Sequence, residues 1–204
     1  MPDSDYFLEL QINTGWGRVL TRFADWIGPE VGGLTLDVGC GPGLLPALLA
    51  QRGCRALGID RDPEMFIPAP LHPQVITADG SHPPFPAHSF DLITASNLLF
   101  LLPDPGVVLQ SMTQFLRPGG QVATLNPTEK LTITAATQMS EAVGLTGLAR
   151  ESLLNWAVRA ENHFHWTESE TIALFHAAGL ELVETKVTMG SGFARFARGM
   201  LVYC

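Results

Sequence analysis

The segment 34–43, Leu-Thr-Leu-Asp-Val-Gly-Cys-Gly-Pro-Gly, constrains the fold of this chain more than any other stretch. Its first half is an apolar run with the length of one buried β-strand, and its single charge is Asp37. Gly39, Gly41 and Gly43 follow at every second position, and glycine permits a sharp turn and a close approach by a ligand. A helix pattern begins directly after the last glycine. Strand, glycine turn and helix together predict the opening of a nucleotide-binding βα unit.

Runs of strand length recur along the chain, and helical patterns separate most of them, as parallel strands require. The expected strands are 34–38, 55–60, 74–78, 90–96, 121–125, 180–189 and 199–204. The last two are joined by a glycine-containing loop, 190–198, without a helix, which predicts an antiparallel hairpin at one sheet edge. The predicted fold class is therefore α/β. We expect a three-layer, Rossmann-like, doubly wound and mostly parallel seven-stranded sheet, with the last strand antiparallel and a helical lid.

The length of 204 residues suits one domain with a substantial core. Within residues 1–204 we expect four parts: an N-terminal helical cap (1–32), a cofactor-binding core (33–126), a lid insertion (127–166), and a C-terminal helix with an edge hairpin (167–204). The cap carries apolar residues at helical spacing, which indicates one or two helices. Its apolar face either packs on the sheet, or its aromatic residues close over a ligand.

Charge and cysteine content exclude several classes of protein. Twelve basic and twenty acidic residues give a net charge of −8, which argues against a general affinity for nucleic acid. Cys40, Cys54 and Cys204 are scattered without a CxxC pair, which indicates reduced thiols and no metal site. The most apolar stretch, 92–102, is interrupted by polar residues and is too short to span a bilayer. We expect a cytoplasmic protein without a membrane span; the sequence does not indicate an oligomeric state.

Two residues near the glycine turn discriminate between nucleotide ligands. The dinucleotide fingerprint G-x-G-x-x-G would need a third glycine at the position of Leu44, which disfavours a dinucleotide-dependent oxidoreductase. The Asp37 carboxylate would repel a pyrophosphate, whereas a ligand with an ammonium and a sulfonium group would tolerate it. The following helix N-terminus could offer its amides to a carboxylate of the same ligand. S-adenosylmethionine carries this set of charges.

Five blocks of sequence resemble the class I S-adenosylmethionine-dependent methyltransferases, and within them the small-molecule branch (type 11) that includes quinone-biosynthesis methyltransferases. The blocks are Leu-Asp-Val-Gly-Cys-Gly-Pro-Gly at 36–43, Gly-Ile-Asp-Arg-Asp-Pro-Glu-Met at 58–65, Ala-Asp-Gly with Pro-Phe-Pro within 78–86, Phe-Asp-Leu-Ile at 90–93, and Leu-Arg-Pro-Gly-Gly at 116–120. They follow the family's order and spacing over residues 34–125. The resemblance implies S-adenosylmethionine as the cofactor. The signature of methylation on DNA bases is absent after the fourth strand.

The resemblance implies cofactor contacts at the carboxyl ends of strands, where doubly wound sheets bind ligands. Asp60 ends the second strand, 21 residues after Gly39, and its carboxylate could accept hydrogen bonds from both ribose hydroxyls. Asp79, beside the Gly80 amide, would accept the adenine amino group. Met65 would contact the adenine face or serve as a core residue. The expected cofactor-binding residues are Asp37, Gly39, Cys40, Gly41, Gly43, Asp60, Arg61, Met65, Asp79, Gly80, Ser96 and Asn97.

The sequence defines the acceptor side less well. Relatives often carry histidine just after the fourth strand, where this chain has Phe-Leu at 100–101, so the catalytic residue is unknown. His163 and His165 are the remaining candidates for a general base, with surface or packing roles as the alternative. The apolar lid suggests an apolar pocket. The expected substrate-binding residues are Tyr6, Trp16, Asn126 and Trp166. Arg-Phe-Ala-Arg at 195–198 is interpreted as a solvated hairpin loop or a small basic patch.

The predicted function is methyl transfer from S-adenosylmethionine to a small, partly apolar molecule. The donor is already activated, so the protein mainly aligns the two reactants and excludes water. The alternative is a non-catalytic module that binds S-adenosylmethionine and regulates or scaffolds a partner, because a fold does not fix a function.

Overall fold

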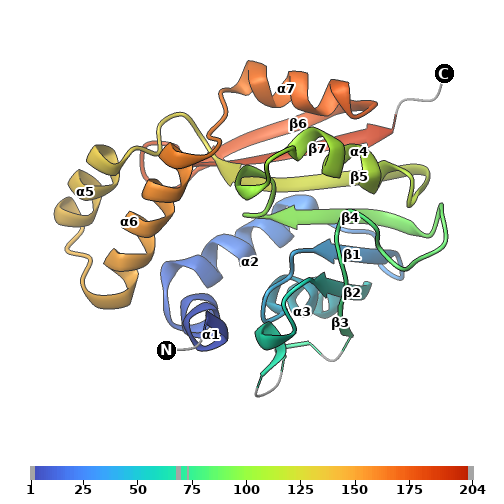
Figure 1. Ribbon diagram of the computed structural model, residues 1–204, viewed down its shortest axis with the longest axis horizontal. Helices are drawn as coiled ribbons and strands as arrows, with labels where there is room; N and C mark the ends of the chain where they lie inside the picture. Colours follow the sequence, from blue (N-terminus) through green and yellow to red (C-terminus); the bar gives the residue numbers. More distant parts are fainter. Residues whose placement is uncertain (1–2, 68–69, 73, 202–204) are drawn as a thin grey trace.

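The structure, a computed structural model, describes residues 3–67, 70–72 and 74–201 of the chain. Its strands form one sheet in the order β3-β2-β1-β4-β5-β7-β6 (Figure 1). The strands are β1 (Leu34–Val38), β2 (Arg55–Asp60), β3 (Val75–Thr77), β4 (Phe90–Ser96), β5 (Leu116–Pro127), β6 (Leu180–Thr188) and β7 (Ala194–Leu201). The first five pair in parallel, whereas β7 is antiparallel to both β5 and β6. The predicted α/β sheet with an antiparallel edge hairpin is confirmed.

Helices cover both faces of this sheet and one end of it (Figure 1). The helices are α1 (Asp3–Asn13), α2 (Gly15–Ile27), α3 (Leu44–Gln51), α4 (Pro105–Thr113), α5 (Ile133–Ala142), α6 (Gly147–Asn162) and α7 (Glu168–Ala177), with short 3₁₀ turns η1 (Pro63–Phe66) and η2 (Leu99–Leu101). Apolar side chains of α2 and α3 pack on one face, and those of α4 and α7 on the other. The helices α5 and α6 lie beyond the carboxyl end of β4, at the left of Figure 1. None of the described helices is long and apolar enough to cross a membrane.

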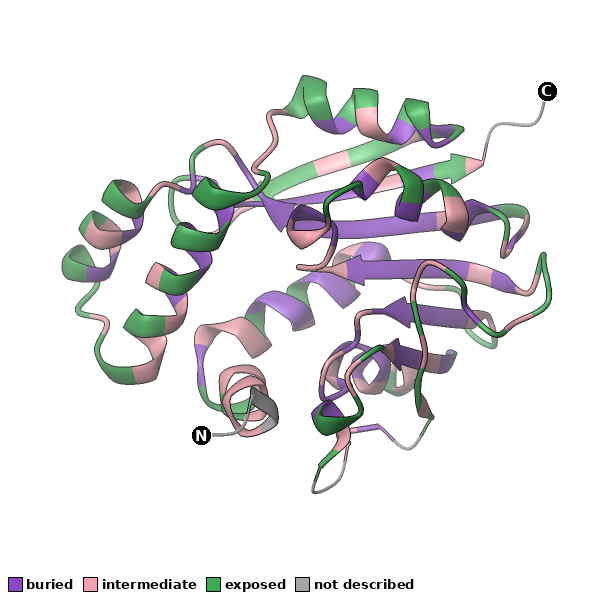
Figure 2. Ribbon diagram, viewed as in Figure 1, coloured by how far each residue is buried: buried purple, intermediate pink, exposed green. Residues whose placement is uncertain are grey.

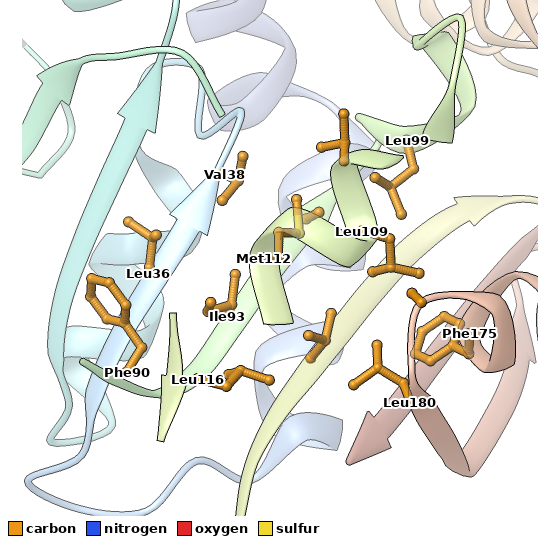
Figure 3. Close-up of a cluster of buried hydrophobic side chains, with 14 of the residues drawn as sticks. Leu36, Val38, Phe90, Ile93, Leu99, Leu109, Met112, Leu116, Phe175 and Leu180 are labelled. Carbon is orange, nitrogen blue, oxygen red and sulfur yellow. The ribbon is translucent and has the colours of Figure 1, made fainter. Parts of the chain in front are cut away.

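The first core cluster lies between the sheet and the helices α4 and α7 (Figure 3). Leu36 and Ile93 come from neighbouring central strands and meet Met112 and Phe175 from the helices, all of them fully buried. Figure 2 shows the same contrast across the molecule: the central strands are buried, and the outer sides of α5, α6 and α7 are exposed. Central parallel strands are covered on both faces, which is why their sequences are nearly continuous apolar runs.

The second cluster, on the opposite face, corrects one prediction. The segment 195–198, interpreted as a solvated loop or basic patch, belongs to strand β7, which begins at Ala194. Phe196 is 1 % exposed, and its ring centroid lies 4.9 Å from that of Phe23 and 5.6 Å from that of Trp26. Arg198 Nη2 donates to Glu184 Oε2 at 2.8 Å on the neighbouring strand. The loop interpretation was wrong because the segment is a strand whose two kinds of side chain have different surroundings. Arg198 pairs with a residue of the neighbouring strand, while Phe196 enters the core. The predicted strand end at 202–204 lies outside the described residues.

Strand β5 also begins earlier than predicted. Phe90 pairs with Leu116 and Leu92 with Gln121, so the register shifts between these two pairs. The Pro-Gly-Gly sequence at 118–120 therefore lies inside the strand, at this irregularity in its pairing. Helix α7 begins with a capping box: Thr167 Oγ1 accepts from the Glu170 amide at 3.2 Å, and Glu170 Oε2 accepts from the Thr167 amide at 2.8 Å.

Candidate functional site

A cavity of about 680 Å³ opens where β1, β2 and β4 end at their carboxyl termini. Its walls come from the glycine turn, the residues after β2 and β4, the helices α1 and α2, and the lid helices α5 and α6. This volume falls within the range of roughly 300 to 1,000 Å³ found for small-molecule sites. The predicted site residues that line it are Tyr6, Trp16, Gly39, Gly41, Asp60, Arg61, Met65, Ser96 and Asn97.

The glycine turn requires its glycines for conformation and for space. Gly39 and Gly41 have φ angles of +70° and +53°, in the left-handed region that side chains disfavour. A Cβ on Gly39 would also lie 3.0 Å from the side chain of Leu98. The amide of Gly39 donates to the Ile59 carbonyl at 2.8 Å, which fixes the turn against β2. Backbone without side chains therefore forms this wall of the cavity.

We expect Gly39→Ala to lower the free energy of unfolding by about 1 to 2 kcal/mol, because an L-residue with a side chain is strained at this φ. Urea denaturation of both proteins measures the difference. Gly32→Ala is the matched control, since Gly32 has a φ of +82° and open space around it. If Gly32→Ala lowers the free energy of unfolding less than Gly39→Ala does, the difference is assigned to the contact of the new Cβ with Leu98. Equal stability of Gly39→Ala and the unaltered protein would contradict the strain argument.

The Asp60 carboxylate connects the glycine turn to the end of β2. Its Oδ2 accepts from the Gly41 amide at 2.9 Å and its Oδ1 accepts from the Asp62 amide at 3.0 Å. An ionised carboxylate has about four lone-pair sites, so each oxygen keeps the capacity to accept another hydrogen bond. Asp60 also lines the cavity, together with Arg61 and Met65. The arrangement holds a negatively charged acceptor of hydrogen bonds at a fixed position in the wall.

Asp37 lies in β1, just before the glycine turn, and only one of its two carboxylate oxygens has a hydrogen-bond partner among the described residues. It is 1 % exposed; its Oδ1 accepts from Thr94 Oγ1 at 2.7 Å, and its Oδ2 has no hydrogen-bond partner. Burial raises the pKa of Asp37 to about 7. The hydrogen bond from Thr94 lowers this pKa, and the charge of Asp60 raises it further. A buried carboxylate in this state interacts favourably with a positively charged ligand group.

Asn97, directly after β4, has two unusual features. Its φ is +57°, which is uncommon for a residue with a side chain, and its Oδ1 is buried without a hydrogen-bond partner. Its amide donates to the Leu125 carbonyl at 2.8 Å, so the backbone position is set by the neighbouring strand. Asn97 and the preceding Ser96 both line the cavity. Strained backbone and an unused polar atom favour a ligand-binding role for this corner.

Five expected cofactor residues are not part of the described lining: Asp37, Cys40, Gly43, Asp79 and Gly80. Burial, followed by the charges of Asp37 and Asp60, raises the pKa of the Cys40 thiol, so it stays protonated. Asp79 is exposed and accepts from the Ser81 amide at 2.8 Å, which is the main cause of its lowered pKa.

Of the residues expected to bind the acceptor, some line the cavity and some do not. Tyr6 and Trp16 line the cavity, whereas Asn126 and Trp166 do not. Asn126 is 6 % exposed, and Trp166 stacks on Phe164 with ring centroids 5.6 Å apart.

The two candidate histidines also lie outside the described lining. The ring Nδ1 of His165 is hydrogen-bonded to the Ala160 carbonyl at 2.8 Å, and His163 ends helix α6. No group of three or more metal-ligating side chains occurs in the described part of the chain.

The sequence interpretation missed several lining residues that come from helices. Trp156 of α6 meets Trp16 of α2 edge to face, with ring centroids 5.2 Å apart, which connects the lid to the N-terminal cap. Gln11 of α1 accepts from the Leu44 amide at 3.3 Å and so caps the helix that follows the glycine turn. Trp156 was recognisable as a large aromatic in the insertion, but nothing in the sequence pairs Gln11 with a segment 33 residues away.

Comparisons with known proteins point in one direction. Residues 8–185 match the family described as "Methyltransferase domain". The ubiquinone biosynthesis O-methyltransferase of Aeromonas salmonicida is 36 % identical over 121 residues, 52 % of this chain and 50 % of that protein. The enzyme of the same name from Leptothrix cholodnii is 28 % identical over 173 residues, 77 % of this chain and 73 % of its own. This chain spans about half the length of several curated relatives that it matches.

Among solved structures, the magnesium protoporphyrin IX methyltransferase of Synechocystis PCC 6803 with bound SAH, the demethylated form of S-adenosylmethionine, has a TM-score of 0.67 to this structure. The identity is 16 %, and the match covers 96 % of this chain and 88 % of that one. At this identity the similarity shows a shared fold.

Proposed function

This chain belongs to the S-adenosylmethionine-dependent methyltransferases, and we propose that it methylates a small, partly apolar molecule in the cavity between the glycine turn and the lid. One observation carries the proposal. A single cavity joins polar groups suited to a sulfonium nucleoside, such as Asp60 and Asn97, to an apolar wall that includes Trp16 and Trp156. The relatives' names as ubiquinone biosynthesis O-methyltransferases support a small acceptor.

The chemistry of the wall fits S-adenosylmethionine. Asp60 has free lone pairs for ribose hydroxyls, and the unpartnered Oδ2 of Asp37 favours a nearby positive charge. The bare backbone at Gly39 and Gly41 leaves room for a close approach. We propose that the cofactor is held by Asp37, the glycine turn, Asp60, Arg61, Met65, Asp79, Gly80, Ser96 and Asn97. When bound, it supplies a methyl group already activated by the sulfonium.

The protein's own contribution is then alignment and the exclusion of water. Trp16 and Trp156 both line the cavity, and their edge-to-face contact holds cap and lid together. An apolar acceptor placed against these rings would be kept in one orientation toward the methyl group. Asp37 and Asp60 hold negative charge near the sulfonium, which favours binding of the donor.

The test has two stages. Calorimetric titration should show binding of S-adenosylmethionine and of S-adenosylhomocysteine, and labelled methyl donor should then give product on a panel of phenols, quinols, amines and carboxylates. Trp156→Ala should raise the KM for the acceptor about tenfold, as loss of a large apolar contact implies, with cofactor affinity unchanged. Trp166→Ala is the matched control, because Trp166 does not line the cavity. No binding of either nucleoside, or equal effects of the two substitutions, would contradict the proposal.

A further inference from the structure

The described lining of the cavity contains few groups that could remove a proton. Its titratable side chains are Tyr6, Arg18, Asp60, Arg61, Asp62 and Arg159, with no histidine, lysine, cysteine or glutamate. Asp60 and Asp62 already accept backbone amides at the cofactor end, at 2.9 to 3.0 Å. The Tyr6 side chain is a phenol, and a neutral phenol is a weak base. An acceptor that enters already deprotonated needs none of these groups.

The cap and lid helices contribute charge of one sign to the same cavity. Arg18 of α2 and Arg159 of α6 line it, and neither forms an ion pair with a carboxylate of the described residues. The acidic lining residues, Asp60 and Asp62, come instead from the end of β2 and the residues directly after it. Arg159 follows Trp156 by three positions on α6, so the two share a helix face. Guanidinium groups in this position suit a carboxylate, which they can bind through two parallel hydrogen bonds.

We propose that the acceptor is an apolar carboxylic acid, bound as its carboxylate by Arg18 and Arg159, and that a carboxylate oxygen takes the methyl group. This inference rests on the proposed function and names its substrate class. Two observations lead to this class independently. The described lining offers few bases, and a carboxylate is ionised at neutral pH without one. The lining also holds two arginines without ion pairs to the described residues, which a carboxylate can pair with. The indole rings of Trp16 and Trp156 contact the apolar body.

The step balances without a proton. A carboxylate oxygen attacks the methyl carbon in line, the C–O bond forms as the C–S bond breaks, and the bonding electron pair returns to sulfur. One negative and one positive charge disappear together, which becomes more favourable as the surroundings become less polar than water. The product is a neutral methyl ester, which has lost its charge-assisted bonds to the arginines, and this favours its release.

The first experiment measures binding in the presence of saturating S-adenosylhomocysteine. The probes are 2-naphthoic acid and decanoic acid, each paired with its neutral analogue, 2-naphthalenemethanol or decanol, so that aromatic and aliphatic bodies are compared. We expect at least one acid to bind about tenfold or more tighter than its alcohol, and Arg18→Gln and Arg159→Gln each to weaken that acid about tenfold. Arg22→Gln on α2 and Arg150→Gln on α6 are matched controls, exposed on the same helices but outside the lining.

The second experiment identifies the methylated atom. With methyl-labelled donor and the same acids, product should release labelled methanol on treatment with base, as an ester does and an ether or amine does not. Equal binding of acid and alcohol, binding of neither, unchanged affinity in both arginine variants, or a base-stable product would overturn the inference. Binding of S-adenosylhomocysteine by all variants separates these outcomes from failure of the proposed function, in which no nucleoside would bind.

Discussion

Asp60→Asn is expected to weaken S-adenosylmethionine binding by about ten- to one-hundredfold, the range given by losing charge-assisted hydrogen bonds. The carboxylate accepts from the amides of Gly41 and Asp62 through its two oxygens. An asparagine has one oxygen and one NH2, so one of these amides would face a donor instead of an acceptor. The substitution therefore removes the charge and also loosens the turn that the cofactor is proposed to contact.

Calorimetric titration of the variant with S-adenosylmethionine and S-adenosylhomocysteine measures this loss. Glu64→Gln is the matched control, because Glu64 is an exposed acid four positions along that does not line the cavity. Thermal unfolding of both variants shows whether the fold is retained. An affinity for both nucleosides equal to that of the unaltered protein would remove Asp60 from the proposed cofactor site.

Asp37→Asn is expected to make the protein more stable at pH 8, by up to about 4 kcal/mol. The pKa of Asp37 is about 7 in the folded protein and 3.8 in the reference state, a difference of about 3 pH units at 1.36 kcal/mol each. Between these values the folded protein binds more protons than the unfolded chain. Stability therefore falls as pH rises from about 4 to about 7, and the penalty stays constant above that window. An asparagine is neutral throughout and can still accept from Thr94.

Urea denaturation at about pH 5 and pH 8 measures the effect as the difference between variant and unaltered protein, which should grow with pH. Asp91→Asn should give the opposite sign at pH 8. Burial acts to raise the pKa of Asp91, but the Leu34 amide at 2.7 Å and Arg117 lower it below its ordinary value. Its ionised form therefore stabilises the fold above pH 4. The Asp37 variant should also bind S-adenosylmethionine more weakly. A pH-independent difference for Asp37→Asn would contradict the assignment.

The half of the cavity formed by the strand ends was largely predictable, because local sequence determines it. Strands β1, β2 and β4 begin and end where predicted, since each is an apolar run that finishes at a glycine, an acid or a small polar residue. In a doubly wound sheet such ends converge at one edge, so Gly39, Asp60 and Asn97 could be placed together without coordinates. Errors occurred where tertiary contacts override local pattern, as in the strand containing Phe196.

The half of the cavity formed by helices was less predictable for a physical reason. Trp16 and Trp156, or Arg18 and Arg159, come from helices about 140 residues apart, and only the packing of the lid on the cap brings them to the same cavity. A single sequence carries no signal for that pairing. His163 and His165 were predicted as candidate bases because histidine can accept a proton. They follow the end of α6 at Asn162, and neither belongs to the described lining of the cavity.

The contact between Trp16 and Trp156 gives the molecule a built-in optical probe. Of the four tryptophans, Trp26 and Trp166 lie outside the cavity lining, while Trp16 and Trp156 line it and contact each other. Their excited states are close enough to share energy, so emission from the pair depends on whether the rings keep their edge-to-face arrangement. Near-ultraviolet circular dichroism and fluorescence lifetimes could therefore follow the filling of this cavity in real time, without a label and without knowing which acceptor has entered.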